Sequence, residues 1–237
     1  MANISEDIYL PNKDLFRDSY ISSLAQYREL YAESISHNSD FWEKRAHEFL
    51  HWQHDFQLTS DCDFSEGLVS WFLGGKLNAC ENCVDRHVKD RGDQVAIIWE
   101  ADEPGNEQKI TYRELQRNVS RLANVLRHNG IRKRDRVAIY MPMIPEAIYA
   151  MLACARIGAV HSVVFAGFSA ESLRDRINDA GCKAVITADE GVRGKKIIPL
   201  KRMVDEAVMA CPSVEHVIIA KRTGTKIPFY APRDIWM

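Results

Sequence analysis

The sequence predicts an α/β protein whose parallel sheet is built from βαβ units. Four short runs rich in β-branched and other apolar residues lie at 136–141, 160–165, 183–188 and 215–220, and one helical segment separates each run from the next. This alternation is typical of right-handed crossovers, because parallel strands cannot be joined by a tight turn. The residues before Gly92 lack the alternation and predict a helical, aromatic-rich N-terminal extension. We therefore expect a helical region over residues 1–91 and an α/β region over residues 92–237.

In the extension, apolar residues recur at three- and four-residue spacing over 15–54, which predicts two or three helices. From 55 to 82 this periodicity lapses. Large aromatic side chains such as Trp71 and Phe72, next to a Gly74-Gly75 turn, indicate a long loop held down by its aromatics. A short helix is expected over 83–91.

Start and stop signals place the elements after Gly92. A strand is expected over 94–100, and Thr111-Tyr112-Arg113-Glu114 forms a capping box that opens a helix ending at His128. Further helices are expected over 145–157 and 199–211. The run 160–165 has the composition of a strand covered on both faces. Ser169 caps the next helix, which ends at Gly181 and turns Leu173, Ile177 and Ala180 inward. Residues 221–237 show no completed element, as if the domain were cut there.

The stretch Asp189-Glu190-Gly191-Val192-Arg193-Gly194-Lys195-Lys196 follows the strand at 183–188 and is too charged to be buried. It lies at the carboxyl edge of the predicted sheet, as does Phe165-Ala166-Gly167, and ligands of open parallel sheets bind at that edge. The Arg193 guanidinium, the charges of Lys195 and Lys196 and an unobstructed Gly194 N–H would suit a phosphate. The alternative is a solvated charged loop that caps a strand.

Other motifs give weaker signals. Cys80-x-x-Cys83 with His87 could be half of a zinc site or a redox pair, but the remaining ligands and the fold context are missing. The stripe of His47, His51 and His54 is expected to be exposed or packed on aromatics. The sequence contains neither of the two common glycine-rich phosphate-binding motifs, and it contains no nucleophile elbow. We expect no metal site and no catalytic residue within these residues.

Composition excludes several classes of function. The chain has 31 basic and 33 acidic residues, so no overall field favours nucleic acid or an anionic membrane. Charged residues interrupt every apolar run before it reaches membrane-spanning length. The six cysteines, with no secretory or organelle leader before them, indicate reduced thiols and a cytoplasmic protein.

Several longer blocks resemble one enzyme family along almost the whole chain. They are Trp71-Phe72-Leu73-Gly74-Gly75-Lys76-Leu77-Asn78, Asp85-Arg86-His87, Ile110-Thr111-Tyr112-Arg113-Glu114-Leu115, Tyr140-Met141-Pro142-Met143-Ile144-Pro145-Glu146 and His161-Ser162-Val163-Val164-Phe165-Ala166-Gly167-Phe168-Ser169. In this order they are similar to the N-terminal third of AMP-forming acetyl-coenzyme A synthetases, within the adenylate-forming superfamily. The resemblance implies that residues 1–91 are the helical N-terminal extension of these synthetases and that residues 92–237 are the first, incomplete α/β part of the AMP-binding domain.

The resemblance implies a two-step reaction in which acetate and MgATP give acetyl-AMP and pyrophosphate, and the thiol of coenzyme A (CoA) then takes the acetyl group. It implies that Arg193, Gly194, Lys195 and Lys196 contact the 3′-phosphate ADP portion of CoA. Phe165, Ala166, Gly167, Ile198 and Pro199 are weaker candidates. Family members often carry arginine where Lys196 stands, which keeps the charge and removes the planar fork.

In the family, the remaining functional parts lie further along the chain. They are the loop that holds the ATP phosphates, the adenine and acetate pockets, and the mobile domain with its lysine. The resemblance therefore implies that these 237 residues alone are inactive. Two alternatives stay open: a propionyl-CoA or other short-chain acyl-CoA synthetase, and a stand-alone nucleotide-binding module. The sequence gives no expectation for the oligomeric state.

Overall fold

The computed structural model describes residues 19–102 and 105–237, and it divides into two compact units that meet between Lys76 and Leu77. The predicted helical start at residues 15–18 lies outside the described residues. The division falls before the domain boundary expected after Arg91, which remains a prediction.

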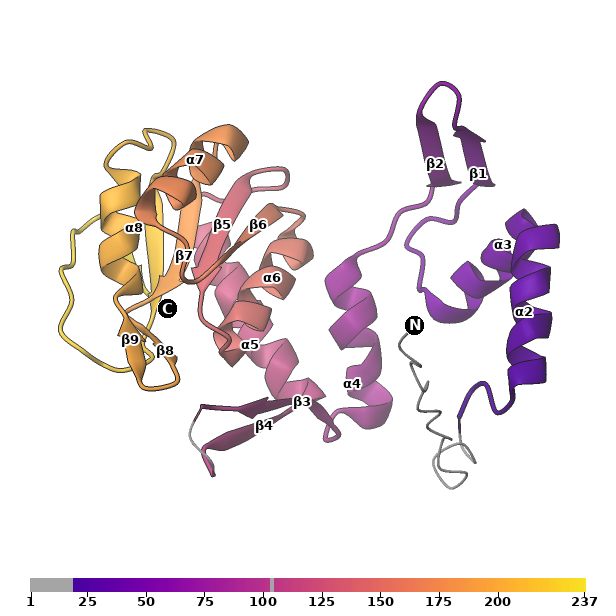
Figure 1. The fold of residues 1–237 in the computed structure, drawn as a ribbon, viewed down its shortest axis with the longest axis horizontal. Helices are drawn as coiled ribbons and strands as arrows, with labels where there is room; N and C mark the ends of the chain where they lie inside the picture. Colours follow the sequence, from indigo (N-terminus) through magenta and orange to yellow (C-terminus); the bar gives the residue numbers. More distant parts are fainter. Residues whose placement is uncertain (1–18, 103–104) are drawn as a thin grey trace, which may run out of the picture. The chain divides into compact units, whose positions relative to one another are not determined.

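Within residues 19–76, the N-terminal unit shows two helices and an antiparallel hairpin (Figure 1). Helix α2 spans Leu24–Ser36 and α3 spans Asn38–Phe49. The hairpin consists of β1 (Leu58–Asp63) and β2 (Leu68–Leu73). The expectation of a long loop over 55–82 is therefore wrong. The two strands are mostly exposed, so they bury no face that would leave an alternating pattern in the sequence.

Of the two predicted aromatic anchors, Phe72 in β2 packs against aromatic side chains that precede β1, whereas Trp71 is exposed. The rings of Trp52, Phe56 and Phe72 lie 5.1–5.6 Å apart, centroid to centroid. Gly75 fits beside them only because it has no side chain, since a Cβ there would come within 2.6 Å of the Trp52 ring.

The second unit begins with a π-helical turn, η1 (Glu81–Asp85), that continues into α4 (Arg86–Arg91). Next come β3 (Val95–Glu100) and β4 (Glu107–Thr111), which pair with each other in antiparallel fashion. The strand expected over 94–100 therefore exists but forms a separate two-stranded sheet with β4, which the sequence did not reveal.

The main sheet has five parallel strands in the order β11-β10-β7-β5-β6, and it confirms the predicted fold class. Its strands are β5 (Arg136–Met141), β6 (Val160–Phe165), β7 (Ala184–Ala188), β10 (His216–Ala220) and β11 (Asp234–Trp236). Strand β11 corrects the expectation that no element forms after residue 220. It has only three residues, which is too short for a recognisable pattern.

In the part of the chain that the structure describes, four helices pack around the sheet: α5 (Tyr112–His128), α6 (Pro145–Ile157), α7 (Ala170–Ala180) and α8 (Leu200–Val208). The predicted caps are present. Thr111 and Glu114 make the capping box, the Ser169 side chain accepts from the Ser172 N–H, and Gly181 closes α7 at φ +58°. The connection from β5 to β6 runs in one direction across the sheet and those from β6 to β7 and β7 to β10 run in the other. Right-handed crossovers then place α6 on one face and α7 with α8 on the opposite face (Figure 1).

The core lies between the helices and the central strands. Strands β5, β7 and β10 are almost fully buried. Strand β6 is not covered on both faces, contrary to the prediction, because it is an edge strand and Val160, Val163 and Phe165 are more than half exposed. Across residues 19–102 and 105–237, no helix is both long and apolar enough to cross a membrane.

Candidate functional site

A hollow of about 390 Å³ lies beyond the carboxyl ends of three strands. Its lining comes from 141–143 after β5, 163–166 in and after β6, and 191–193 after β7, together with Asp102 and Ile198. The chain leaves β5 toward one face of the sheet and leaves β6 and β7 toward the other, so this is a topological switch point, where open α/β sheets bind ligands. We call it the strand-end hollow.

The charged stretch after β7 is a small antiparallel hairpin rather than an irregular loop. Strand β8 (Gly191–Arg193) pairs with β9 (Lys196–Ile198), so that Arg193 lies opposite Lys196 and Gly194-Lys195 forms the tip. Gly194 has φ +56°, the left-handed conformation that favours glycine at the start of a two-residue hairpin loop. We call residues 191–198 the basic hairpin.

The cations of the basic hairpin are exposed and available. Within the described part of the chain, no carboxylate lies within ion-pair distance of Arg193, Lys195 or Lys196. The Arg193 guanidinium carbon lies 5.6 Å from the centre of the Phe165 ring, in a cation–π contact that joins the hairpin to the end of β6. Both residues line the strand-end hollow.

The turn between β6 and α7 is shaped by a buried tyrosine. The Tyr140 hydroxyl donates to the Phe168 carbonyl over 2.7 Å and accepts from the Gly167 N–H over 3.3 Å. Burial raises the pKa of this phenol, which keeps the hydroxyl protonated and able to donate. Gly167 has φ +145°, a conformation that side-chain-bearing residues rarely adopt. Tyr140 therefore fixes the backbone of Phe165-Ala166-Gly167.

One polar residue at the strand-end hollow was missed by sequence reasoning. The Gly194 N–H donates to the Asp102 carboxylate, which comes from the connection after β3. This contact spans 92 positions along the chain, and nothing in the local pattern around Asp102 indicates it.

The predicted site residues divide into two groups. Phe165, Ala166, Arg193 and Ile198 line the strand-end hollow together. Gly194, Lys195 and Lys196 lie on the exposed end of the same hairpin, while Gly167 and Pro199 lie beside the lining residues without belonging to them.

Asp189, at the start of the charged stretch, is buried, contrary to the prediction. Its carboxylate accepts from the backbone N–H groups of Glu190, Arg222, Thr223 and Gly224 at 2.7–3.3 Å. A carboxylate with this many donors is tolerated in the interior because its lone pairs are satisfied. Asp189 therefore has a structural role, in tying the ends of β7 and β10 together.

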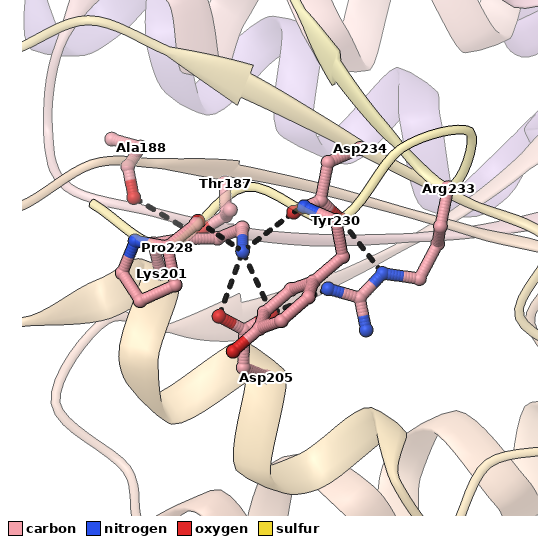
Figure 2. Close-up of polar contacts among 8 residues, drawn as sticks. All are labelled: Thr187, Ala188, Lys201, Asp205, Pro228, Tyr230, Arg233 and Asp234. Carbon is pink, nitrogen blue, oxygen red and sulfur yellow. Dashed lines mark hydrogen bonds and ion pairs between the residues drawn. The ribbon is translucent and has the colours of Figure 1, made fainter.

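A second group of charges, which begins three residues after the basic hairpin, is fully paired. We call Lys201, Asp205, Arg233 and Asp234 the ionic network (Figure 2). The Lys201 ammonium is completely buried and lies 2.7 Å from both Asp205 oxygens, 2.8 Å from Asp234 and 3.1 Å from the Pro228 carbonyl. Arg233 bonds the same two carboxylates at 2.5 and 2.7 Å. The network ties α8 to β11.

The pKa of Asp234 reflects this pairing. Burial alone would raise the pKa, but the hydrogen bonds from Arg233 and Lys201 outweigh burial and hold the pKa below its ordinary value. Asp234 therefore stays ionised, and the network contains two cations and two anions.

The histidine and cysteine motifs do not form a metal centre in the described residues, where no three His, Cys, Asp or Glu side chains are grouped to hold an ion. Cys80 is buried, Cys83 is exposed, and all six cysteines are free. The histidine stripe is broken because α3 ends at Phe49, before His51 and His54, while His47 stacks on Phe56 at 4.8 Å.

The structure is an α/β domain with a hollow beyond its strand ends, bordered by the exposed cations of the basic hairpin. Two family models match this chain: "AMP-binding enzyme" over residues 84–231 and "Acetyl-coenzyme A synthetase N-terminus" over residues 27–83. The chain belongs to the family of AMP-binding enzymes.

Similar proteins agree with this assignment. The chain is 53% identical to acetyl-coenzyme A synthetase 2 of Pseudomonas aeruginosa, covering 95% of this chain and 35% of that protein. It is 54% identical to acetyl-coenzyme A synthetase of Penicillium chrysogenum, covering 92% and 33%. Acetoacetyl-CoA synthetase from Streptomyces lividans has a similar structure, with a TM-score of 0.81 and 27% identity over 93% of this chain and 33% of that one. The predicted resemblance is confirmed, and the chain spans about a third of the length of these relatives.

Proposed function

We propose that this chain is the N-terminal part of an acetate–CoA ligase. The whole enzyme would form acetyl-AMP from acetate and ATP and then transfer the acetyl group to the thiol of CoA. Identity of 53% with an acetyl-coenzyme A synthetase over 95% of the chain carries this proposal. ATP and CoA would be substrates, and Mg²⁺ would enter with ATP. The described residues offer no group of side chains fit to hold the ion, so we assign no Mg²⁺ ligand here.

Within this function, we propose that the basic hairpin binds the phosphate-bearing end of CoA. Arg193 would supply a planar guanidinium, Gly194 a backbone N–H, and Lys195 and Lys196 positive charge. The exposure of these cations and their lack of carboxylate partners in the described residues support the proposal, because a structural cation would be paired. Phe165, Ala166, Gly167, Ile198 and Pro199 would shape the adjacent surface. Catalytic residues would come from outside these 237 residues, and the chain by itself would be inactive.

The test of this site is Arg193→Ala in the full-length enzyme. Loss of a charged hydrogen bond should weaken CoA binding by about 1.5–3 kcal/mol, or roughly 10–150-fold. Pyrophosphate exchange driven by acetate and ATP without CoA should change little. Arg176→Ala is a matched control, because Arg176 lies over the Phe168 ring at 5.4 Å and does not line the strand-end hollow. Unchanged CoA affinity, or an equal loss of pyrophosphate exchange, would refute the assignment.

The acyl substrate needs its own measurement. Comparing kcat/KM for acetate and propionate in the full-length enzyme would separate an acetate enzyme from a propionyl-CoA or other short-chain acyl-CoA synthetase. A stand-alone nucleotide-binding module would show no acyl-dependent pyrophosphate exchange at all. A cytoplasmic location remains a prediction from the sequence.

A further inference from the structure

Asp102 accepts a hydrogen bond from the Gly194 N–H, the donor that the proposed function assigns to the ligand. The Gly194 N–H at the tip of the basic hairpin donates to Asp102 Oδ2. This N–H belongs to the same hairpin as Arg193, and Asp102 and Arg193 both line the strand-end hollow. A carboxylate therefore lies where a phosphate oxygen of the ligand would have to bind.

Contacts outside Asp102 hold the chain just before it in place and leave its side chain free to turn. The β3–β4 pairing extends to Glu100 opposite Glu107, and the Ala101 N–H donates to the Asn106 carbonyl over 3.0 Å. One residue before Glu100, the Trp99 indole N–H donates to the Met143 carbonyl over 2.7 Å, and Met143 lines the strand-end hollow. The connection after β3 is thus attached to the rim of the hollow independently of Gly194.

Asp102 satisfies the N–H without neutralising the neighbouring cations. Among the ion pairs of the described residues, none joins Asp102 to Arg193, Lys195 or Lys196. A phosphate dianion carries more charge than one carboxylate and has more acceptor oxygens, so it can bond Gly194 and the cations together. The ligand phosphate should displace the carboxylate, and the two anions should repel each other while both are near the tip.

We propose that Asp102 is an internal competitor for the anion site of the basic hairpin, and that it sets the affinity for CoA. This inference rests on the proposed function. Asp102 satisfies the Gly194 N–H in the unliganded protein and moves away when the 3′-phosphate of CoA arrives. The thioester product keeps the same phosphate, so Asp102 lowers the affinity for substrate and product alike.

The test is Asp102→Asn in the full-length enzyme, with CoA and 3′-dephospho-CoA as probes in equilibrium titrations. Removing the charge should tighten CoA binding by about 3–10-fold and leave 3′-dephospho-CoA within about twofold, because a ligand without the 3′-phosphate need not displace Asp102. Asp102→Glu keeps the charge and should stay near wild type. Glu107→Gln makes the same charge change on β4, away from the hollow, and should leave CoA binding unchanged.

Weaker CoA binding by Asp102→Asn, no change, or an equal shift for both probes would overturn the inference. Arg193→Ala measured in parallel separates this failure from that of the proposed function. If Arg193→Ala weakens CoA while Asp102→Asn has no effect, only the role of Asp102 is wrong. If neither variant affects CoA, the hairpin is not the CoA site.

Discussion

The basic hairpin and the ionic network use the same kinds of side chain in opposite ways. Arg193 and Lys196 are exposed, with no ion-pair partner among the described residues, whereas Lys201, only five residues further along, is completely buried between two carboxylates. A buried cation must be paired, and once paired it has no capacity left for a ligand. The difference teaches that burial and pairing, rather than residue type, separate a candidate binding cation from a structural one.

The largest expected effect tests the structural side of this comparison. Lys201→Met should lower the free energy of unfolding by about 3–5 kcal/mol, because Asp205 and Asp234 would share the single guanidinium of Arg233 in a buried place. Urea denaturation of the variant measures this loss. Lys109→Met, which removes an exposed lysine 3.6 Å from Glu107, should cost less than about 1 kcal/mol. Equal losses in the two variants would show that the buried network contributes no more to stability than an exposed lysine does.

The pH dependence of stability is a second test of the ionic network. Because the pKa of Asp234 is depressed in the folded protein, its contribution to stability is present above the unfolded-state pKa of about 3.9 and is lost as the pH falls through the folded-state value. Unfolding free energies between pH 6 and pH 3 should therefore fall steeply below about pH 4. Asp234→Asn should be less stable at neutral pH and show a shallower fall, while the exposed Asp93→Asn should follow the wild type. Parallel curves for all three proteins would contradict the assignment.

The smallest expected effect tests the other half of the comparison, the exposed cations of the basic hairpin. Lys196→Arg should tighten CoA binding by about 2–5-fold in the full-length enzyme, because a guanidinium can bond a phosphate through two N–H groups. Stability should not change, since Lys196 is exposed. Lys109→Arg on β4 is the control for a general effect of the exchange. Weaker CoA binding in Lys196→Arg would indicate that the ammonium has a specific geometric role.

The sequence predicted the elements that local signals define. The capping box at Thr111, the serine cap at Ser169 and the glycine stop at Gly181 each act within one turn of a helix, so they are readable without the fold. Strands β5 and β6 were predicted to the residue, because single helices separate their apolar runs from the neighbouring strands.

The remaining features depend on contacts across the chain. The β1–β2 hairpin is largely exposed and leaves no periodic signal, and β8 and β9 are too short to leave one. The sequence around Asp189 predicts an exposed charge. In the structure its carboxylate is buried because the loop after β10 donates three backbone hydrogen bonds to it. Asp102 contacts Gly194 across 92 positions of the chain, and the Trp99 bond to Met143, in the connection after β5, attaches the β3–β4 hairpin near that point. Local composition therefore located the basic hairpin but could not reveal its carboxylate neighbour.

Strand β6 has a practical consequence for handling these residues in isolation. In the described structure it pairs only with β5, so its second backbone edge is open, and Val160, Val163 and Phe165 are uncovered beside that edge. Open edges flanked by apolar side chains recruit strands from other molecules. We expect a preparation of these 237 residues alone to self-associate with rising concentration, and a lysine placed at Val163 to be a simple way to keep it monomeric.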